Sequence, residues 1–274
     1  MNKCSQGSCN FPSLTAADTC WIHLNNKKEW VDKLVSSLKG SPYVLINAHL
    51  DGISFENTDL SKSDFSGATL TNCNFSGSVL ANALLKRSKF VNCSFYGAEL
   101  TDSIWEGSIL KNCNLEKSKG KKVDWNRIKL IESSLKDSIF SEGDFRNALL
   151  LRVDGTNLKA SRILADRSTV FYCNFSHGML PGAVFGGSSW IETDLSNVDL
   201  TYSNLVGAYF EKCNLREAVI ENSARITEST FIECDLSGTS FSHSIIRGSL
   251  KMGGTSEGIV LDGAKLERSN LNNT

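Results

Sequence analysis

Three cysteines and one histidine near the N-terminus have residue types and a spacing that suit a metal ion. Cys4, Cys9, Cys20 and His23 form a C-x4-C-x10-C-x2-H array. Thiolates and imidazoles are good Zn²⁺ ligands, and four of them make a closed structural site. Metal binding could hold this short, weakly apolar segment in place. Residues 1–24 are therefore expected to form a Cys/His head that could bind zinc; a loosely ordered head with unligated cysteines is the alternative.

Catalytic constellations are missing from the sequence. His49, His177 and His243 occur singly, without a neighbouring nucleophile or carboxylate pair, and no phosphate loop or dinucleotide fingerprint is present. The sequence therefore predicts no catalytic residues and no enzyme activity. It also contains no apolar stretch of membrane-spanning length and no signal-peptide pattern. We expect a cytoplasmic protein without membrane contact, in which a disulfide is disfavoured.

A short amphipathic helix is predicted within residues 25–41. Its apolar residues recur at helical spacing, Asn25 or Asn26 can cap its start, and Gly40 with Pro42 ends it. The residues on the apolar face are Trp30, Val31, Leu34, Val35 and Leu38. A repeat rod must cover its open apolar end, so we expect this helix to cap the first coil.

From residue 42 to residue 274 the sequence repeats every five residues. A large apolar residue recurs in phase more than twenty times, and a small residue stands two places before it. A helix of 3.6 residues per turn makes no stripe with this period, and a flat strand has a period of two. Short extended pieces joined by turns fit the pattern, with the large and small residues both inward. The first large positions are Leu45, Leu50, Phe55, Leu60, Phe65, Leu70 and Phe75.

A second period of twenty residues sets the number of sides. Cysteines recur at the small position with this spacing or a multiple of it, the last one residue late. If one coil holds twenty residues, these thiols lie in one inward column on one side of a four-sided coil. As small apolar fillers without neighbouring histidines, they are expected to be reduced and inert. The column contains Cys73, Cys93, Cys113, Cys173, Cys213 and Cys234.

The segments NTDLS, SGATL, GAELT, SNLVG and GAKLE resemble the A(D/N)LXX motif of the pentapeptide-repeat family. This resemblance implies an all-β solenoid, a right-handed quadrilateral parallel β-helix of about eleven coils, plus the short N-terminal capping helix. Relatives include many bacterial proteins and some secreted effectors. Others are acidic rods, usually dimeric through C-terminal elements, that imitate DNA and modulate DNA gyrase.

The middle of the repeat is basic and irregular in pattern. Residues 86–167 carry sixteen Lys/Arg and eleven Asp/Glu, whereas residues 41–85 and 168–274 are net acidic. Gly120 replaces a large residue without loss of phase. An alignment on Leu158 and Ile163 predicts a bulge near 152–155 and an insertion near 166–167; another extra residue falls near Asn222, and residues 250–258 lack the pattern. The predicted partner-binding residues are Lys117, Lys119, Lys121, Lys122, Arg152 and Arg167.

These features favour a non-enzymatic protein-binding or scaffold protein, with a partner on the faces or the basic middle. A DNA-mimic modulator of gyrase is one alternative, although the basic middle and the lack of a C-terminal helix depart from that type. A zinc-head adaptor with the rod as spacer is another. No recognition helix or interleaved aromatic residues indicate direct nucleic-acid binding. The last segment, LERSNLNNT, is in repeat phase but has no capping helix. Either polar side chains blunt this open parallel edge, or a partner or a second copy covers it, the latter as a homodimer through the C-terminal end.

Overall fold

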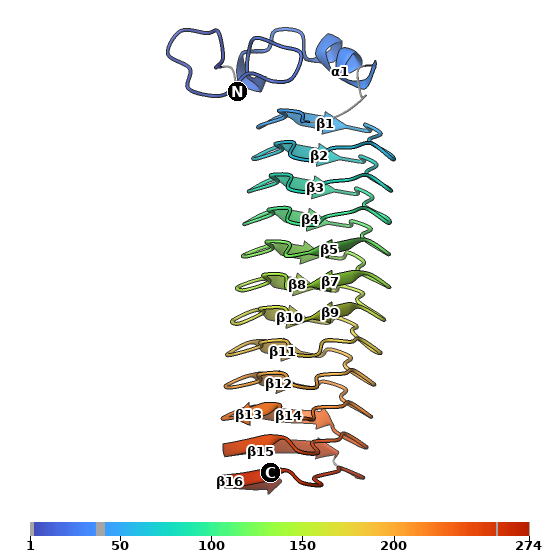
Figure 1. Cartoon of the computed structure of the whole chain (residues 1–274), viewed down its shortest axis with the longest axis vertical. Helices are drawn as coiled ribbons and strands as arrows, with labels where there is room; N and C mark the ends of the chain where they lie inside the picture. Colours follow the sequence, from blue (N-terminus) through green and yellow to red (C-terminus); the bar gives the residue numbers. More distant parts are fainter. Residues whose placement is uncertain (1–2, 37–41, 256, 274) are drawn as a thin grey trace.

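The chain forms a β-solenoid with a small head at one end, as the computed structural model shows for residues 3–36, 42–255 and 257–273. The coils stack into a straight rod, and the head lies across its N-terminal end (Figure 1). Each coil holds twenty residues over most of the rod, so that His49 pairs with Thr69 and Leu50 with Leu70. The predicted four-sided parallel solenoid is confirmed.

A tight turn every five residues makes the four sides. Ala48 N–H donates to Leu45 C=O at 3.1 Å across such a turn, and the third turn residue, Asn47, has φ of +56°. A positive φ at this place is the mark of a type II turn, which favours Gly and Asn. The middle coils instead place charged residues there, among them Arg127 and Glu132. Each such residue costs about 1–2 kcal/mol in the left-handed region.

Parallel strands stack along the sides of the rod. We call the longer stack the main sheet; a second, shorter sheet lies half a coil away. The main sheet contains β1 (His49–Asp51), β2 (Thr69–Thr71), β3 (Lys89–Val91), β4 (Ile109–Lys111), β6 (Lys129–Ile131), β8 (Leu149–Leu151), β10 (Thr169–Phe171), β11 (Ser189–Ile191), β12 (Tyr209–Glu211), β14 (Thr230–Asp235), β15 (Ile245–Thr255) and β16 (Lys265–Asn273), and β13 (Arg225–Thr227) pairs with β15. The second sheet contains β5 (Lys119–Lys121), β7 (Ile139–Ser141) and β9 (Lys159–Ser161).

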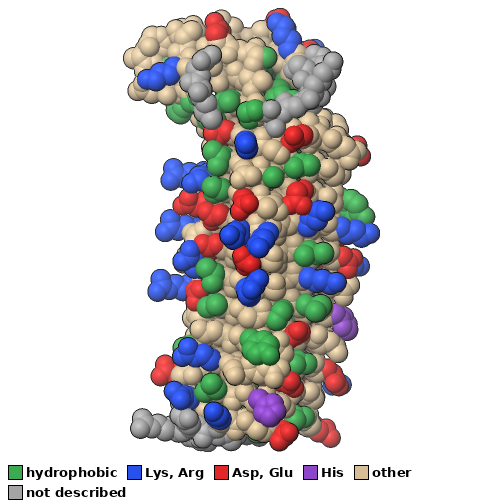
Figure 2. Space-filling model, viewed as in Figure 1, with side chains coloured by type: hydrophobic (Ala, Val, Ile, Leu, Met, Phe, Trp, Pro, Cys, Tyr) green, Lys and Arg blue, Asp and Glu red, His purple; other side chains and the backbone are tan. Residues whose placement is uncertain are grey.

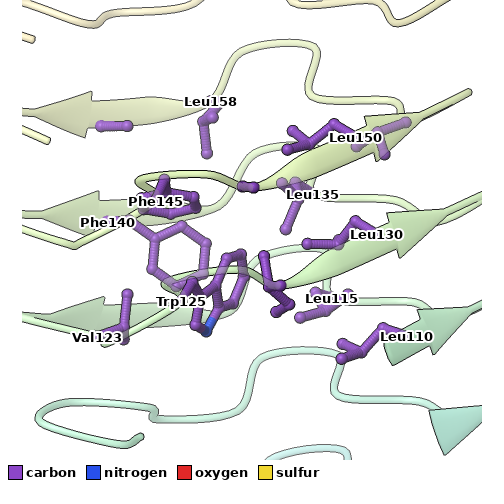
Figure 3. Packing of buried hydrophobic residues seen from close by; sticks show 14 of the residues in the cluster. Leu110, Leu115, Val123, Trp125, Leu130, Leu135, Phe140, Phe145, Leu150 and Leu158 are labelled. Carbon is purple, nitrogen blue, oxygen red and sulfur yellow. The ribbon is translucent and has the colours of Figure 1, made fainter. Parts of the chain in front are cut away.

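The core is a filled cylinder of large side chains. The ring of Phe75 stacks on those of Phe55 and Phe95, with centroids 4.8 and 4.7 Å apart. Further along, Trp125 packs between Phe140 and Phe145 in the interior of the coil (Figure 3). The cysteine column lies at the small inward position, as predicted, with every thiol buried.

The predicted bulge near 152–155 and the insertion near 166–167 are wrong. Leu150 pairs directly with Val170, so this coil also holds twenty residues. Instead, the sizes of the inward side chains are exchanged. Gly155 and two alanines stand where the repeat has a large residue, and three branched residues stand where it has a small one. The ring of Phe175 fills the space beside Gly155, since a Cβ added there would lie 2.4 Å from the ring. The exchanged residues are Ala160 and Ala165, and Val153, Leu158 and Ile163.

Two other irregularities match the sequence. Gly120 lies buried in β5, where Val123 occupies its place: a Cβ on Gly120 would meet the Val123 side chain at 2.7 Å. The extra residue near Asn222 is confirmed, because Asn222 and Ser223 both have positive φ and the step from Asn204 to Arg225 is one residue longer than a coil. Residues 250–258 lack the repeat pattern, yet their first part continues as strand β15.

The head and helix α1 (Lys27–Ser36) cover the first coil. Asn26 caps the helix, because its Oδ1 accepts the Glu29 N–H at 3.1 Å while its amide donates to the Glu29 carboxylate. Trp30 and Leu34 are buried in the same apolar cluster as the first coil. Residues 37–41, where the helix was expected to end, lie outside the described residues. The predicted capping helix is confirmed.

Candidate functional site

The four residues of the predicted metal site lie together in the head. Their ligand atoms all lie within 4.8 Å of one another. The Nδ1 of His23 lies 3.3 Å from Cys4 Sγ and 3.5 Å from Cys20 Sγ, and the sulfurs of Cys9 and Cys20 are 3.8 Å apart. Residues separated by up to nineteen positions thus converge on one point. The cluster could hold a metal ion.

Three of the six distances between the ligand atoms fit the edges of a tetrahedron around Zn²⁺. Zn–S and Zn–N bonds of about 2.3 and 2.0 Å give edges of about 3.8 Å between two sulfurs and about 3.5 Å between sulfur and nitrogen. The three measured distances are 3.8, 3.3 and 3.5 Å. A disulfide would bring two sulfurs to about 2 Å, so none is formed between Cys9 and Cys20. The donor set of three thiolates and one imidazole is complete.

Local backbone geometry brings the ligands together. Cys4 N–H donates to Phe11 C=O at 2.9 Å, and Cys9 N–H donates to Gln6 C=O at 3.0 Å, so the chain between Cys4 and Cys9 closes on itself. Cys20 directly precedes the 3-10 turn η1 (Trp21–His23), and His23 is its last residue. A short loop and one helical turn therefore present two ligands each.

The cluster lowers the pKa of one thiol. Burial alone would raise the pKa of Cys4, but backbone hydrogen bonds at Cys20 and Gln6, with the side chains of His23 and Cys20, lower it to about 6. A backbone hydrogen bond at Phe11 lowers the pKa of Cys9. Burial and the neighbouring thiols of Cys20 and Cys4 outweigh it, so that the pKa of Cys9 is raised. Cys4 is therefore a thiolate near neutral pH, which is the form that binds a metal.

The metal cluster is tied to the first coil through Thr15 and two tryptophans. Thr15 N–H donates to Val44 C=O at 2.9 Å, and Val44 N–H donates to Thr15 Oγ1 at 2.6 Å. Trp30 Nε1 donates to Thr15 C=O, and Trp21, next to Cys20, stacks on His49 of β1 with centroids 5.6 Å apart. The head that contains the Cys/His cluster therefore contacts the first coil through hydrogen bonds and stacked rings.

Head and column thiols should differ in reactivity. In metal-free protein, alkylation under native conditions should label at most the three head cysteines, Cys9 first because it alone is only half-buried, and denaturation should release all nine. The column thiols are buried, and burial raises the pKa of Cys173 to about 11. Intact-mass measurement after iodoacetamide treatment checks this. Native labelling of more than three thiols would contradict the inert column.

The six predicted partner-binding residues do not form one patch. Lys117, Lys122, Arg152 and Arg167 occupy turn positions with positive φ on four different corners, and the remaining two lie on β5. Most have partners: Lys119 pairs with Glu99, Lys121 with Glu142 and Arg152 with Glu132, while Lys117 lies over the Tyr96 ring. Figure 2 shows Lys and Arg side chains interleaved with Asp and Glu over the middle coils.

A different basic site, which we call the arginine groove, lies along one corner. Arg127 and Arg167 share this corner two coils apart, and Arg146 lies between them. Among the described residues, the ion pairs include neither Arg127 nor Arg167. Arg146 binds Asp144, and Gly186 and Gly187 leave the end of the groove open. The lining residues are Asn126, Arg127, Arg146, Asn147, Asp166, Arg167, Gly186 and Gly187.

Comparisons with known proteins point to a repeat family. A model of the pentapeptide repeat region matches residues 43–119, and one of eight pentapeptide repeats matches residues 180–217. No curated protein sequence matches significantly. No helix among the described residues is long and apolar enough to cross a membrane.

Several solved structures share the solenoid shape. HetL, a pentapeptide-repeat protein involved in heterocyst differentiation regulation in the cyanobacterium Nostoc sp. strain PCC 7120, is 19% identical, with 90% of this chain and 95% of that chain covered and a TM-score of 0.28. A trypsin-treated variant of QnrB1, a plasmid-mediated fluoroquinolone resistance protein, is 16% identical over 81% and 85%, with a TM-score of 0.38. The periplasmic alginate epimerase AlgG is 11% identical over 88% and 82%, with a TM-score of 0.37. Because two repeat models match residues 43–119 and 180–217 and the turns recur every five residues in twenty-residue coils, the rod is built of pentapeptide repeats.

Proposed function

We propose that the chain is a non-enzymatic binding rod that holds an acidic segment of a protein partner in the arginine groove. The observation that carries this is the pair Arg127 and Arg167, exposed and without a carboxylate partner in the described structure. Arginine is suited to carboxylates because its planar guanidinium offers two parallel donors. Arg146 is paired with Asp144, so the groove offers two arginines without an ion pair, Arg127 and Arg167, against the one carboxylate in its lining, Asp166.

The other basic residues of the middle coils suit this role less well. Arg162 donates to Glu142 at 2.8 Å, and Arg152 to Glu132 at 3.4 Å, so these charges are already neutralised across neighbouring coils. Backbones two coils apart are separated by about 10 Å, so Arg127 and Arg167 could contact acidic residues three positions apart in an extended segment. A partner strand running parallel to the rod axis fits this spacing.

The head supplies a metal-stabilised cap in the same proposal. Three thiolates and one imidazole in tetrahedral arrangement select zinc among the common divalent ions, and a closed site with four protein ligands leaves no position for substrate. The role of Cys4, Cys9, Cys20 and His23 is then structural: zinc fixes the head, and the head covers the first coil through Thr15 and Trp30. The rod is the binding part, which separates this proposal from an adaptor that binds through its head.

The groove can be tested with an acidic peptide. A fluorescein-labelled decaglutamate peptide should bind the whole protein at low salt, and Arg127→Ala/Arg167→Ala should weaken binding about tenfold or more in fluorescence anisotropy. The matched control is Arg152→Ala/Arg162→Ala, which removes the same charge from the same kind of turn but from residues held in ion pairs. We expect less than about a threefold change there. Equal losses in both variants would contradict a specific groove.

A gyrase supercoiling assay distinguishes the proposed function from the alternative of a DNA mimic that modulates gyrase. A DNA mimic needs an acidic surface, whereas residues 86–167 of this chain carry more Lys/Arg than Asp/Glu. We expect no effect on supercoiling at a large excess of the protein. Inhibition or protection of gyrase by wild type, retained in Arg127→Ala/Arg167→Ala, would replace the proposed function.

A further inference from the structure

One outward column of the main sheet is unusually apolar. In its three-residue strands the middle residue is buried, and the first and third point outward, as in Leu149–Leu151. The third residues stack in register over eight successive strands, with a one-to-one match from each strand to the next (Figure 1). This outer column consists of Val91, Lys111, Ile131, Leu151, Phe171, Ile191, Glu211 and Ile232.

The outward positions on the next side of the rod are polar, so the repeat fold does not require apolar residues on its outer surface. There, residues at the same twenty-residue spacing are all Ser, Asn or Asp, and they stack through isolated bridges. The set is Ser54, Asn74, Ser94, Asn114, Ser134, Asp154, Asn174, Asp194, Asn214 and Asp235. A third outward column, of Asp64, Leu84, Ile104, Asp124, Asp144, Leu164, Val184 and Asn204, is half apolar, but no more than two of its apolar residues are adjacent. The outer column has four in a row, from Ile131 to Ile191, and such a run on the surface indicates an interaction site.

The order of residues in the outer column is self-complementary. A two-fold axis parallel to the strands, placed between Leu151 and Phe171, turns the column onto itself end for end. Each apolar residue then meets an apolar residue, and the single Lys meets the single Glu. The facing pairs are Leu151 with Phe171, Ile131 with Ile191, Lys111 with Glu211 and Val91 with Ile232, each formed twice.

We propose that two copies of this chain dock face to face through the main sheet, with their rods antiparallel. Charge complementarity fixes the register, because any one-strand slip places Lys111 and Glu211 on apolar residues. A closed two-fold contact uses the same patch on both copies. Among the first strand residues, Ile109 faces Tyr209 and Leu149 faces Thr169, while Lys89 and Lys129 face Thr230 and Ser189.

The corner beside the column agrees with the same axis. In the proposed dimer Arg152 faces Tyr172 of the second copy. Within one copy the Arg152 guanidinium lies 5.9 Å from the centroid of the Tyr172 ring, which is a cation–π contact of the same kind. Glu132 faces Glu192, a like-charge contact at the rim. Lys111 and Arg152 of its own copy lie 3.9 and 3.4 Å from Glu132 and offset its charge. These exposed ion pairs are weak, so they can rearrange at little cost.

The size of the face predicts a weak dimer. Seven steps of about 4.8 Å give a contact about 34 Å long, and three strand residues give a width of about 10 Å. The two surfaces together bury on the order of 700 Å², which is in the size range of weak, transient contacts. We therefore expect a dissociation constant in the micromolar range.

Sedimentation velocity tests the dimer at protein concentrations from about 1 to about 200 μM, which bracket the expected micromolar dissociation constant. Lys111→Glu and Glu211→Lys should each weaken association about tenfold or more, because each places like charges opposite one another. Lys111→Glu/Glu211→Lys should return to within about threefold of wild type, and a folding defect would not be rescued in this way. Lys159→Glu on β9 of the second sheet makes the same charge change away from the face and should have no effect. A monomer throughout the range, or failure of the double variant to recover, overturns the proposal.

A carbodiimide reaction gives a second, direct readout. This zero-length reagent joins an amine to a carboxylate in contact, with loss of water to an amide bond. Lys111 and Glu211 lie five strands, or about 24 Å, apart within one copy, so an amide between them can form only between two copies. Mass spectrometry of the dimer band should find this linkage in wild-type protein. A dimer with cross-links elsewhere, for example between C-terminal residues, would contradict the face-to-face arrangement.

Discussion

Purified protein is expected to carry one zinc ion per chain, and Cys20→Ser is expected to lose it. Cys20 Sγ lies 3.8 Å from Cys9 Sγ and 3.5 Å from His23 Nδ1, so its removal takes away one of the four corners of the tetrahedron. Loss of one of the four ligands should weaken zinc binding at least about 100-fold, since structural sites gain about 10–16 kcal/mol from the full ligand set. Elemental analysis with protein quantification measures the stoichiometry.

The same variant should also release the cap. Trp21 follows Cys20 directly and stacks on His49, and Trp30 packs against it with centroids 6.0 Å apart. Removal of the metal should therefore change the near-ultraviolet circular dichroism of these tryptophans, while the rod keeps its far-ultraviolet β spectrum.

Cys73→Ser is the matched control for the metal prediction. It makes the same atomic change at the small inward position, where serine already occurs at Ser63 and Ser78. Zinc content should stay at one per chain in this variant. A wild-type protein prepared without chelators that contains no zinc, and cannot be reconstituted with it, would remove the metal from the proposed function.

The period and the caps could be predicted from sequence because they depend on local rules. Asn26 stands three residues before Glu29, and the pair makes the reciprocal cap seen at α1. The cysteines at twenty-residue spacing give the coil length without knowledge of the contacts. The clustering of Cys4, Cys9, Cys20 and His23 also follows from their short separations.

The coil between Leu150 and Val170 could not be predicted because inward positions were assigned by size. Packing conserves the volume of a layer rather than the size at each position, so a large residue at Leu158 can accompany a glycine at Gly155. An alignment by residue size therefore treats the exchange as a shift of phase. Only the register of Leu150 with Val170 shows that no residue is inserted.

The arginine groove was missed for a different reason. Charge along the sequence places Arg127 and Arg167 far apart, whereas the twenty-residue coil places them on one corner. The signal was present: positions separated by forty residues share a corner once the coil length is known. Lysines close in sequence, such as Lys121 and Lys122, instead diverge because one lies on β5 and the other at the turn.

Restoring the repeat motif at Gly155 is expected to destabilise the rod. Gly155→Leu puts the usual large residue at a large position, but its Cβ alone would lie 2.4 Å from the Phe175 ring. Overpacking of this kind costs about 1–3 kcal/mol, and we expect the upper end because Phe175 is itself buried and held by Trp190 at 5.8 Å. Urea unfolding measures the loss as a lower midpoint, with the slope checked for two-state behaviour.

Two further variants identify the cause of that loss. Gly97→Ala has nothing within 4 Å of its Cβ but a φ of +64°, so it should cost only the backbone term of about 1 kcal/mol. Phe175→Ala alone should cost about 3–5 kcal/mol by leaving a cavity. Gly155→Leu/Phe175→Ala should be more stable than the sum of the two single changes by about 1–3 kcal/mol, because the leucine fills the space that the ring leaves. Additive losses, or a more stable Gly155→Leu, would show that the two positions do not share one volume and that the coil tolerates the repeat motif after all.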